Sequence, residues 1–219
     1  MLVKRIVDVW REEGLKGLWF KGLAKTVYRR AVLVERPLDA PLPAITPSVA
    51  VDIRLLGGTD VDAYVAFRPK TRTADMRDRL ARGHVCFAAW REGRIVSAAW
   101  LATGVVWIDY LERELRLAAD EAYLYESYTA PGLRGQNIPA LRGACEARHF
   151  RDAGYRRQVA VIVPENRPAL RHAEKAGWRV FGLMGYVKLG PWRRDFCRVD
   201  PGARPPGAEL ISPAGARPA

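Results

Sequence analysis

Apolar residues follow two periods along this chain, and the two periods alternate in a mixed order. Short runs in which every second residue is apolar predict strands, and apolar residues that recur every three or four positions predict helices. Strands are predicted at 51–56, 85–90, 95–101, 123–129, 159–163, 178–189 and 195–199, and helices at 60–67, 74–81, 139–153 and 168–176. Residues 107–117 fit neither period clearly.

Two local arrangements in this order predict how neighbouring strands pair. The pair Glu92-Gly93 separates two alternating runs, which is typical of an antiparallel hairpin. The strand at 123–129, the helix at 139–153 and the strand at 159–163 form a crossover unit. Two strands joined by a helix are expected to be parallel, with a right-handed connection.

The two ends of the chain differ in composition from the middle. Residues 1–31 hold eight Lys or Arg and three Asp or Glu, and their spacing predicts two short amphipathic helices. We expect them to pack on the domain, with attachment to an anionic membrane surface as the alternative. Four prolines between Pro37 and Pro47 indicate a connector. We therefore expect a basic extension and connector at 1–48, a main domain at 49–199, and a disordered tail at 200–219, which holds five prolines and three glycines.

The formal charge of +12 indicates an anionic partner: a nucleic acid, an acidic membrane or a phosphate-rich cofactor. The chain has no recognition-helix pattern and no RNA-binding aromatic motif, so we expect no nucleic acid. Its three cysteines and three histidines lack the spacing of metal ligands, and we expect no metal. The sequence shows neither a membrane-length apolar run nor a secretory signal, which favours the cytoplasm.

The loop between the predicted strand and helix of the crossover has the chemistry of an anion site. It reads Thr-Ala-Pro-Gly-Leu-Arg-Gly-Gln-Asn-Ile-Pro-Ala over 129–140. A loop at the start of a helix presents free backbone N–H groups and the positive end of the helix dipole. Arg134 adds a positive charge beside them.

Two blocks of sequence together carry a family resemblance. Pro131 is followed by Arg-Gly-Gln-Asn-Ile-Pro at 134–139, and a second block, Asn-Arg-Pro-Ala-Leu-Arg-His-Ala-Glu-Lys-Ala-Gly-Trp, stands at 166–178. In type and spacing, these blocks resemble the GNAT superfamily of acyl-coenzyme A-dependent N-acyltransferases. The resemblance implies a mixed α+β fold. Its central sheet would be mostly antiparallel, with one parallel β-α-β crossover holding the cofactor and helices on both faces.

The resemblance also implies a reaction and a set of site residues. An acyl-coenzyme A, with acetyl-coenzyme A as the first expectation, would donate its acyl group directly to an amine. Its pantetheine would lie where the two parallel strands splay apart. The implied cofactor-binding residues are Ser127, Tyr128, Thr129, Arg134, Gly135, Gln136, Asn137, Ile138, Pro139, Ala140, Asn166 and Arg171.

Three residues depart from the family pattern. Asn137 and Pro139 stand where the family usually has small residues. Asn tolerates a left-handed backbone, whereas Pro139 has no N–H to offer a phosphate oxygen. Ala173 stands where the family often has the Tyr that protonates the departing thiolate. We therefore expect weaker cofactor contacts and identify no general acid.

Glu126 is the candidate general base, because it is the one carboxylate within 123–129. A charged residue in the middle of a strand is costly unless it is solvated or paired, so a Glu paired with a nearby Arg is the alternative. Tyr123, Tyr125 and Tyr128 either line an acceptor cavity or pack as ordinary strand residues.

Two other functions remain open at this level. An acyl carrier protein could replace coenzyme A as the donor and dock on the basic surface. Alternatively, the chain could be a catalytically degenerate GNAT-fold binding or regulatory module, which Asn137, Pro139 and Ala173 favour. The acceptor amine, the acyl length and the oligomeric state are not determined by the sequence.

Overall fold

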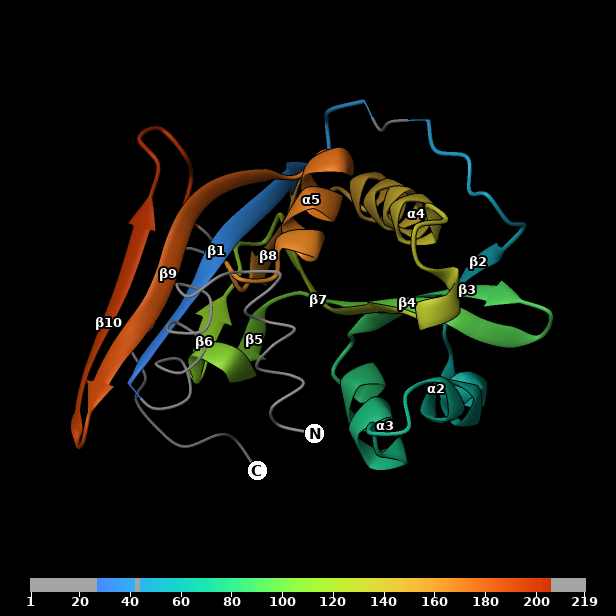
Figure 1. Ribbon diagram of the computed structural model, residues 1–219, viewed down its shortest axis with the longest axis horizontal. Coiled ribbons are helices and arrows are strands. Elements are labelled where there is room, and N and C mark those ends of the chain that lie inside the picture. The colour runs from blue at the N-terminus through green and yellow to red at the C-terminus, as the bar shows by residue number, and fades with distance from the viewer. Residues whose placement is uncertain (1–26, 42–43, 206–219) are drawn as a thin grey trace.

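The computed structural model describes residues 27–41 and 44–205 of the chain (Figure 1). An eight-stranded sheet has the order β10-β9-β1-β8-β7-β4-β3-β2, and β5 and β6 form a separate hairpin. The strands are β1 Tyr28–Pro37, β2 Asp52–Leu55, β3 Val85–Arg91, β4 Arg94–Ala102, β5 Val105–Ile108, β6 Arg113–Arg116, β7 Glu121–Thr129, β8 Arg157–Ile162, β9 Arg179–Leu189 and β10 Trp192–Val199. The α-helices are α2 Val61–Phe67, α3 Thr73–Ala81, α4 Ile138–Asp152 and α5 Arg167–Lys175. Three 3-10 turns are η1 Gly58–Asp60, η2 Asp109–Leu111 and η3 Pro131–Leu133.

The sheet is antiparallel at every junction except that between β7 and β8, which pair in parallel. Helices α4 and α5 lie on one face of the sheet, and α2, α3 and the β5–β6 hairpin lie on the other (Figure 1). The expected α+β architecture is therefore confirmed, including its single parallel pair and its helices on both faces.

The elements predicted from periodicity agree with the structure to within a few residues at their ends. In the β3–β4 hairpin, Glu92 and Gly93 both have positive φ, at 51° and 73°. This is the backbone that a tight two-residue hairpin turn requires. The ambiguous segment 107–117 contains the end of β5, the turn η2 and β6.

The first strand corrects the predicted domain boundary. Residues 28–37 form β1, which lies between β8 and β9 inside the main sheet. These residues therefore belong to the main domain, which does not begin at residue 49, and not to a basic extension or connector. Ala31 and Leu33 are buried on one face, and Val34 is buried on the other. A strand buried on both faces lacks the alternation of apolar and polar residues, so the sequence of β1 does not show the period of a strand. Basic helices are predicted within residues 1–31, of which residues 28–31 belong to β1 and residues 1–26 lie outside the described residues.

The predicted start of the disordered tail is also wrong. The backbone carbonyls of Arg204 and Pro205 accept hydrogen bonds from the Arg157 guanidinium, at 2.7 and 2.8 Å. Arg204 in turn binds the Asp120 carboxylate through two nitrogens, at 2.7 and 2.8 Å. Residues 200–205 thus dock through polar contacts that an apolar pattern cannot reveal. Residues 206–219 are outside the described part of the chain.

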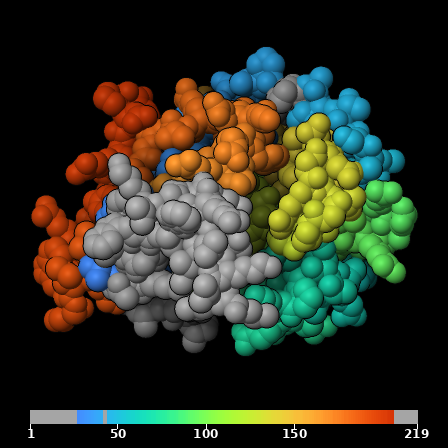
Figure 2. Space-filling model, viewed as in Figure 1, coloured from blue at the N-terminus to red at the C-terminus, as the bar shows by residue number. Residues whose placement is uncertain are grey.

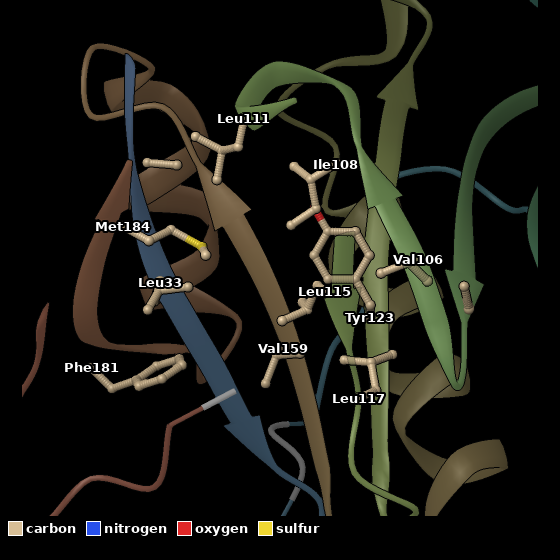
Figure 3. Close-up of a cluster of buried hydrophobic side chains, with 12 residues drawn as sticks. Leu33, Val106, Ile108, Leu111, Leu115, Leu117, Tyr123, Val159, Phe181 and Met184 are labelled. Atoms are coloured by element: carbon tan, nitrogen blue, oxygen red, sulfur yellow. The ribbon is translucent and has the colours of Figure 1, made fainter. Parts of the chain in front are cut away.

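A buried cluster joins the β5–β6 hairpin to the middle of the sheet (Figure 3). The sheet contributes Leu33, Tyr123, Val159, Phe181 and Met184, and the hairpin with its turn contributes Val106, Ile108, Leu111 and Leu115. Tyr123 and Val159 are also the last paired residues of β7 and β8. The cluster therefore packs against the point at which these two strands separate. Among the described helices, none is both long and apolar enough to cross a membrane.

Candidate functional site

The parallel strands β7 and β8 pair over three residues and then separate. The paired residues are Glu121 with Arg157, Ala122 with Gln158, and Tyr123 with Val159. Both strands continue, to Thr129 and Ile162, without further pairing between them. This is the divergence that the family resemblance implies. It leaves backbone groups of β7 without a strand partner on one edge, where an extended ligand can bind them.

A buried ion cluster holds the paired ends of these strands. Arg157 of β8 contacts the carboxylates of Glu121 on β7 and Glu35 on β1. All three residues are at most 6% exposed. Because each charge has a partner inside the sheet, the cluster fixes the strands at the closed end of the opening.

A β-bulge in β7 lies within the opening. Trp100 of β4 opposes Tyr125, and Ala98 opposes Tyr128, so Glu126 and Ser127 together oppose the single residue Ala99. Glu126 has a positive φ of 49°. A bulge bends its strand and changes where its side chains point.

The bulge directs two polar side chains to opposite faces of the sheet. The Glu126 carboxylate meets Arg79 of α3, whose Nη1 and Nη2 donate to Oε2 and Oε1 at 2.6 and 2.7 Å. The Ser127 hydroxyl meets Arg142 of α4, whose Nη2 donates to Oγ at 2.6 Å. One point on β7 therefore presents a carboxylate toward α2 and α3 and a hydroxyl toward α4.

The structure places an anion-binding backbone at the start of α4. Gly135 and Asn137 have positive φ values of 79° and 57°, and the Asn137 side chain makes no capping hydrogen bond. Within the described residues, no protein group accepts from the backbone N–H groups of Gly135, Gln136, Asn137, Ile138 or Ala140. Successive free N–H groups at the positive end of a helix form a nest for phosphate oxygens. Asn137 thus adopts the left-handed backbone that an Asn tolerates.

Several features of this loop suit a phosphate-rich ligand. A Cβ built on Gly135 would meet no atom within 4 Å, so the glycine is required by its φ and the space beside it is open. Arg134 is exposed, and its Nε donates to the Thr129 carbonyl at 3.4 Å. No acidic side chain occurs between Ala130 and Ala140. Pro139 occupies the first turn of α4, where a missing N–H leaves the helix intact.

A buried polar network fixes this loop against the sheet. Arg142 is 2% exposed, and its guanidinium pairs with Glu146 at 2.7 Å and donates to the Ser97 hydroxyl at 2.5 Å. Ser97 and Thr129 share a hydrogen bond of 2.8 Å across β4 and β7. The sequence reasoning missed Arg142, because an Arg and a Glu four positions apart on a helix are also typical of a solvated face.

Two other residues implied by the resemblance, Asn166 and Arg171, belong to α5 and its N-cap. Asn166 is the N-cap of α5, and its side-chain oxygen accepts from the Ala169 N–H at 3.3 Å. Arg171 lines a pocket of about 560 Å³ formed by α5, β1 and β9. None of the residues that line this pocket belongs to β7, β8, α4 or the loop. Arg171 thus contributes to this pocket, and its role in binding the cofactor stays a prediction.

The three tyrosines of β7 have different surroundings. Tyr123 is buried in the central cluster and stacks on Tyr125, with ring centroids 6.1 Å apart. The Tyr125 hydroxyl lies 2.7 Å from Nδ1 of His84. Burial raises the pKa of both phenols, so they remain protonated at neutral pH. Tyr128 lies beside Phe67 of α2, at a centroid distance of 5.5 Å. Tyr123 is thus an ordinary packing residue, and the other two lie on the α2–α3 side.

The pair formed by Arg79 and Glu126 is partly open to solvent. The Arg79 side chain is 21% exposed, and the Glu126 side chain is 34% exposed. Burial opposes the charge on Arg79, but the hydrogen bonds and the charge of Glu126 outweigh it, so the pKa of the guanidinium is raised. The arrangement matches the alternative in which Glu126 pairs with a nearby Arg. It also leaves the Glu126 side chain partly exposed to solvent.

The chain shares its architecture with solved acetyltransferase structures. One is an acetyltransferase from the GNAT family of Colwellia psychrerythraea, with a TM-score of 0.52, 16% identity, and coverage of 76% of this chain and 59% of that one. Another is the aminoglycoside N-acetyltransferase AAC(6')-Iy in complex with coenzyme A, with a TM-score of 0.51, 14% identity, and coverage of 69% and 98%. The chain has the GNAT fold. A GNAT-family acetyltransferase from Novosphingobium aromaticivorans is 21% identical, with a TM-score of 0.49 and coverage of 72% and 63%.

The shared fold does not extend over the whole of every similar protein. This chain spans 59% of the Colwellia protein and 63% of the Novosphingobium protein. No protein-family model and no curated protein matches the sequence. On the side of the molecule that Figure 2 shows, the surface of α4 lies between that of α5 and that of the α2–α3 pair. Within the described residues, no group of three or more His, Cys, Asp or Glu is placed to hold a metal ion.

Proposed function

We propose that this protein is an acyl-coenzyme A-dependent N-acyltransferase, with acetyl-coenzyme A as its first candidate donor. The observation that carries the proposal is the separation of β7 from β8 after Tyr123, beside a loop with free N–H groups at the start of α4. The GNAT fold of the chain adds support, because a solved structure with this fold is in complex with coenzyme A. A fold hosts many chemistries, so the proposal rests on the site.

The loop residues would bind the diphosphate of the donor. The N–H groups of Gly135, Gln136, Asn137, Ile138 and Ala140 are free to donate, and Arg134 adds charge. Pro139 supplies no donor, so one potential hydrogen bond is missing. The unpaired edge of β7, around Ser127 to Ala130, would bind the extended pantetheine. The donor supplies an activated thioester; the chain supplies its position.

Glu126 would accept the proton that the amine loses on attack. Two of the roughly four lone-pair positions of its carboxylate are taken by Arg79, which leaves others for the amine or a bridging water. Arg79 then acts as a positioning residue, because its fork holds the carboxylate in one orientation. The nitrogen bonds to the acyl carbon, the carbon–sulfur bond breaks, and the thiolate takes a proton from solvent. Ala173 provides no acid for that last step.

Calorimetric titration with coenzyme A and acetyl-coenzyme A tests the donor assignment. A bound donor should raise the melting temperature, because it stabilises the folded state by mass action. Arg134→Ala should weaken binding, whereas Arg148→Ala, which removes the same charge from the exposed side of α4, should not. Absence of binding by coenzyme A and by acyl donors of several lengths at millimolar concentration would refute the proposal.

A donor carried by an acyl carrier protein is the alternative that the net charge of +12 supports. Titration of a holo carrier protein against free coenzyme A separates the two donors. An inactive binding module is supported by the Arg79 contacts, which occupy both oxygens of Glu126. Such a module would bind coenzyme A but release none from acetyl-coenzyme A in the presence of any amine.

A further inference from the structure

Two guanidinium groups converge on one aromatic ring beside Glu126. The central carbon of the Arg68 guanidinium lies 4.2 Å from the ring centroid of Tyr128, and that of Arg134 lies 5.9 Å from it. Arg68 is the C-cap of α2, and Arg134 belongs to the loop before α4. In the part of the chain that the structure describes, neither arginine forms an ion pair with a carboxylate.

The charges around this ring do not balance. Glu126 is the carboxylate of β7 on this face, and Arg79 already neutralises it through two hydrogen bonds. On the neighbouring helix α3, Arg72 pairs with Asp75, and Arg82 pairs with Asp78. Arg68 and Arg134 therefore leave a local excess of positive charge. Like charges held close together repel each other unless an anion lies between or beside them.

The two arginines have different surroundings. Arg134 lies in the loop with the free N–H groups, where a donor diphosphate would neutralise it. Arg68 lies at the end of α2, on the sheet face that also carries Glu126 and Arg79. Of the two arginines that contact the Tyr128 ring, Arg134 would then be neutralised by the bound donor, and Arg68 would still lack an anion among the described residues. Its planar fork suits a carboxylate or a phosphate group.

We propose that the acceptor is a small amine that also carries a carboxylate or phosphate group, which Arg68 binds while the amine faces Glu126. This inference rests on the proposed function. Glu126 and Tyr128 are two positions apart on β7 across the bulge, and both side chains contact the α2–α3 side, so the two charged groups of the acceptor must be close together. Phe67 and Tyr128 offer an aromatic contact between them.

The inference separates this chain from the aminoglycoside N-acetyltransferase AAC(6')-Iy, which has a similar fold. Aminoglycosides are polycations. At this site one ammonium group could face Glu126, but the others would meet Arg68, so their binding would be opposed by charge. A zwitterionic amine presents one group of each sign to Glu126 and Arg68.

Matched pairs of amines test the proposal on the full-length protein saturated with coenzyme A. The probes are amino acids with their decarboxylated amines, phosphoethanolamine with ethanolamine, and the aminoglycosides sisomicin and neamine. Calorimetry on the coenzyme A complex measures binding. In separate samples that contain acetyl-coenzyme A and no added coenzyme A, a thiol reagent measures the coenzyme A released. We expect at least one anionic member to bind about 10- to 100-fold more tightly than its partner, as one charge-assisted hydrogen-bonded contact permits.

Variants of Arg68 connect this preference to the residue. Arg68→Gln should bring the preference of the matched pair close to one, and Arg68→Lys should restore part of it. Arg72→Gln is the control, because that side chain is 81% exposed and pairs with Asp75. It should leave the preference unchanged.

Three outcomes would overturn the inference. Tighter binding of aminoglycosides or of the decarboxylated amines contradicts it directly. Weaker coenzyme A binding in Arg68→Gln with an unchanged preference among amines assigns Arg68 to the donor. If acetyl-coenzyme A binds but no anionic amine does at millimolar concentration, this inference fails alone, whereas failure of acetyl-coenzyme A to bind removes the proposed function as well.

Discussion

Replacing Glu126 with Gln removes a charge from the bulge of β7 and keeps the shape of the side chain. The structure separates two consequences of this change. If Glu126 only pairs with Arg79, then stability, donor binding and turnover should change together. If it accepts the proton of the attacking amine, turnover should fall while the other two quantities stay nearly constant.

The expected loss of stability is small. The two hydrogen bonds to Arg79 are short, at 2.6 and 2.7 Å, but the side chains are 21% and 34% exposed. Ion pairs that water reaches contribute roughly 0–1 kcal/mol to the free energy of unfolding. For a chain of this size, that corresponds to a decrease of at most about 2–4 °C in the melting temperature.

The expected loss of turnover is much larger. General-base catalysis contributes about 10²- to 10⁴-fold to the rate. With an amine that the protein acylates, kcat should therefore fall by that factor in Glu126→Gln. The measurements are coenzyme A release at saturating acetyl-coenzyme A, donor binding by calorimetry and thermal unfolding. The acidic limb of the kcat/KM profile should also flatten, with the remaining rate following the concentration of free amine.

A matched control keeps the result interpretable. Glu112→Gln also removes a carboxylate that pairs with an arginine, Arg29 at 3.0 Å, and its side chain is 37% exposed. It lies beside the β5–β6 hairpin and not on β7. It should leave turnover unchanged. Wild-type turnover in Glu126→Gln, or a loss of turnover matched by a loss of donor binding, would refute the assignment of Glu126 as the base.

Three further predictions concern stability and need no acceptor. Truncation after residue 200 removes two carbonyl acceptors of Arg157 and should cost about 1–3 kcal/mol in urea unfolding relative to truncation after residue 205; equal curves would show that the docked segment contributes nothing. Arg142→Met should cost about 3–5 kcal/mol because it removes the ion pair of the buried Glu146, and adding Glu146→Leu should recover much of that loss; no recovery would mean that packing matters more than charge. Burial and the charges of Arg79 and Arg82 lower the pKa of His84, so the unfolded chain binds a proton that the folded chain resists, and stability should fall as the pH drops below about 6.5. His84→Gln should flatten that fall, and an unchanged slope would assign it to other groups.

Features that depend on neighbours in the sequence can be predicted from the sequence alone. Helical and strand periods are local, so most strands and helices of the main sheet were predicted close to their observed ends. The loop before α4 was also legible, because positive φ at Gly135 and Asn137 is a property of those residues in that local order. The free N–H groups follow from the helix start that the sequence predicted.

Features that depend on partners far away in the chain cannot be predicted from the sequence alone. β1 pairs with β8 and β9, which lie more than a hundred residues away in the chain, and its burial on both faces removes the alternation that marks a strand. The partner of Glu126 is Arg79 because a bulge in β7 turns that carboxylate toward α3. Arg142 is a core residue because α4 packs across Ser97 and Ser127. In each case, long-range register and packing select the partner, and a single sequence does not record them.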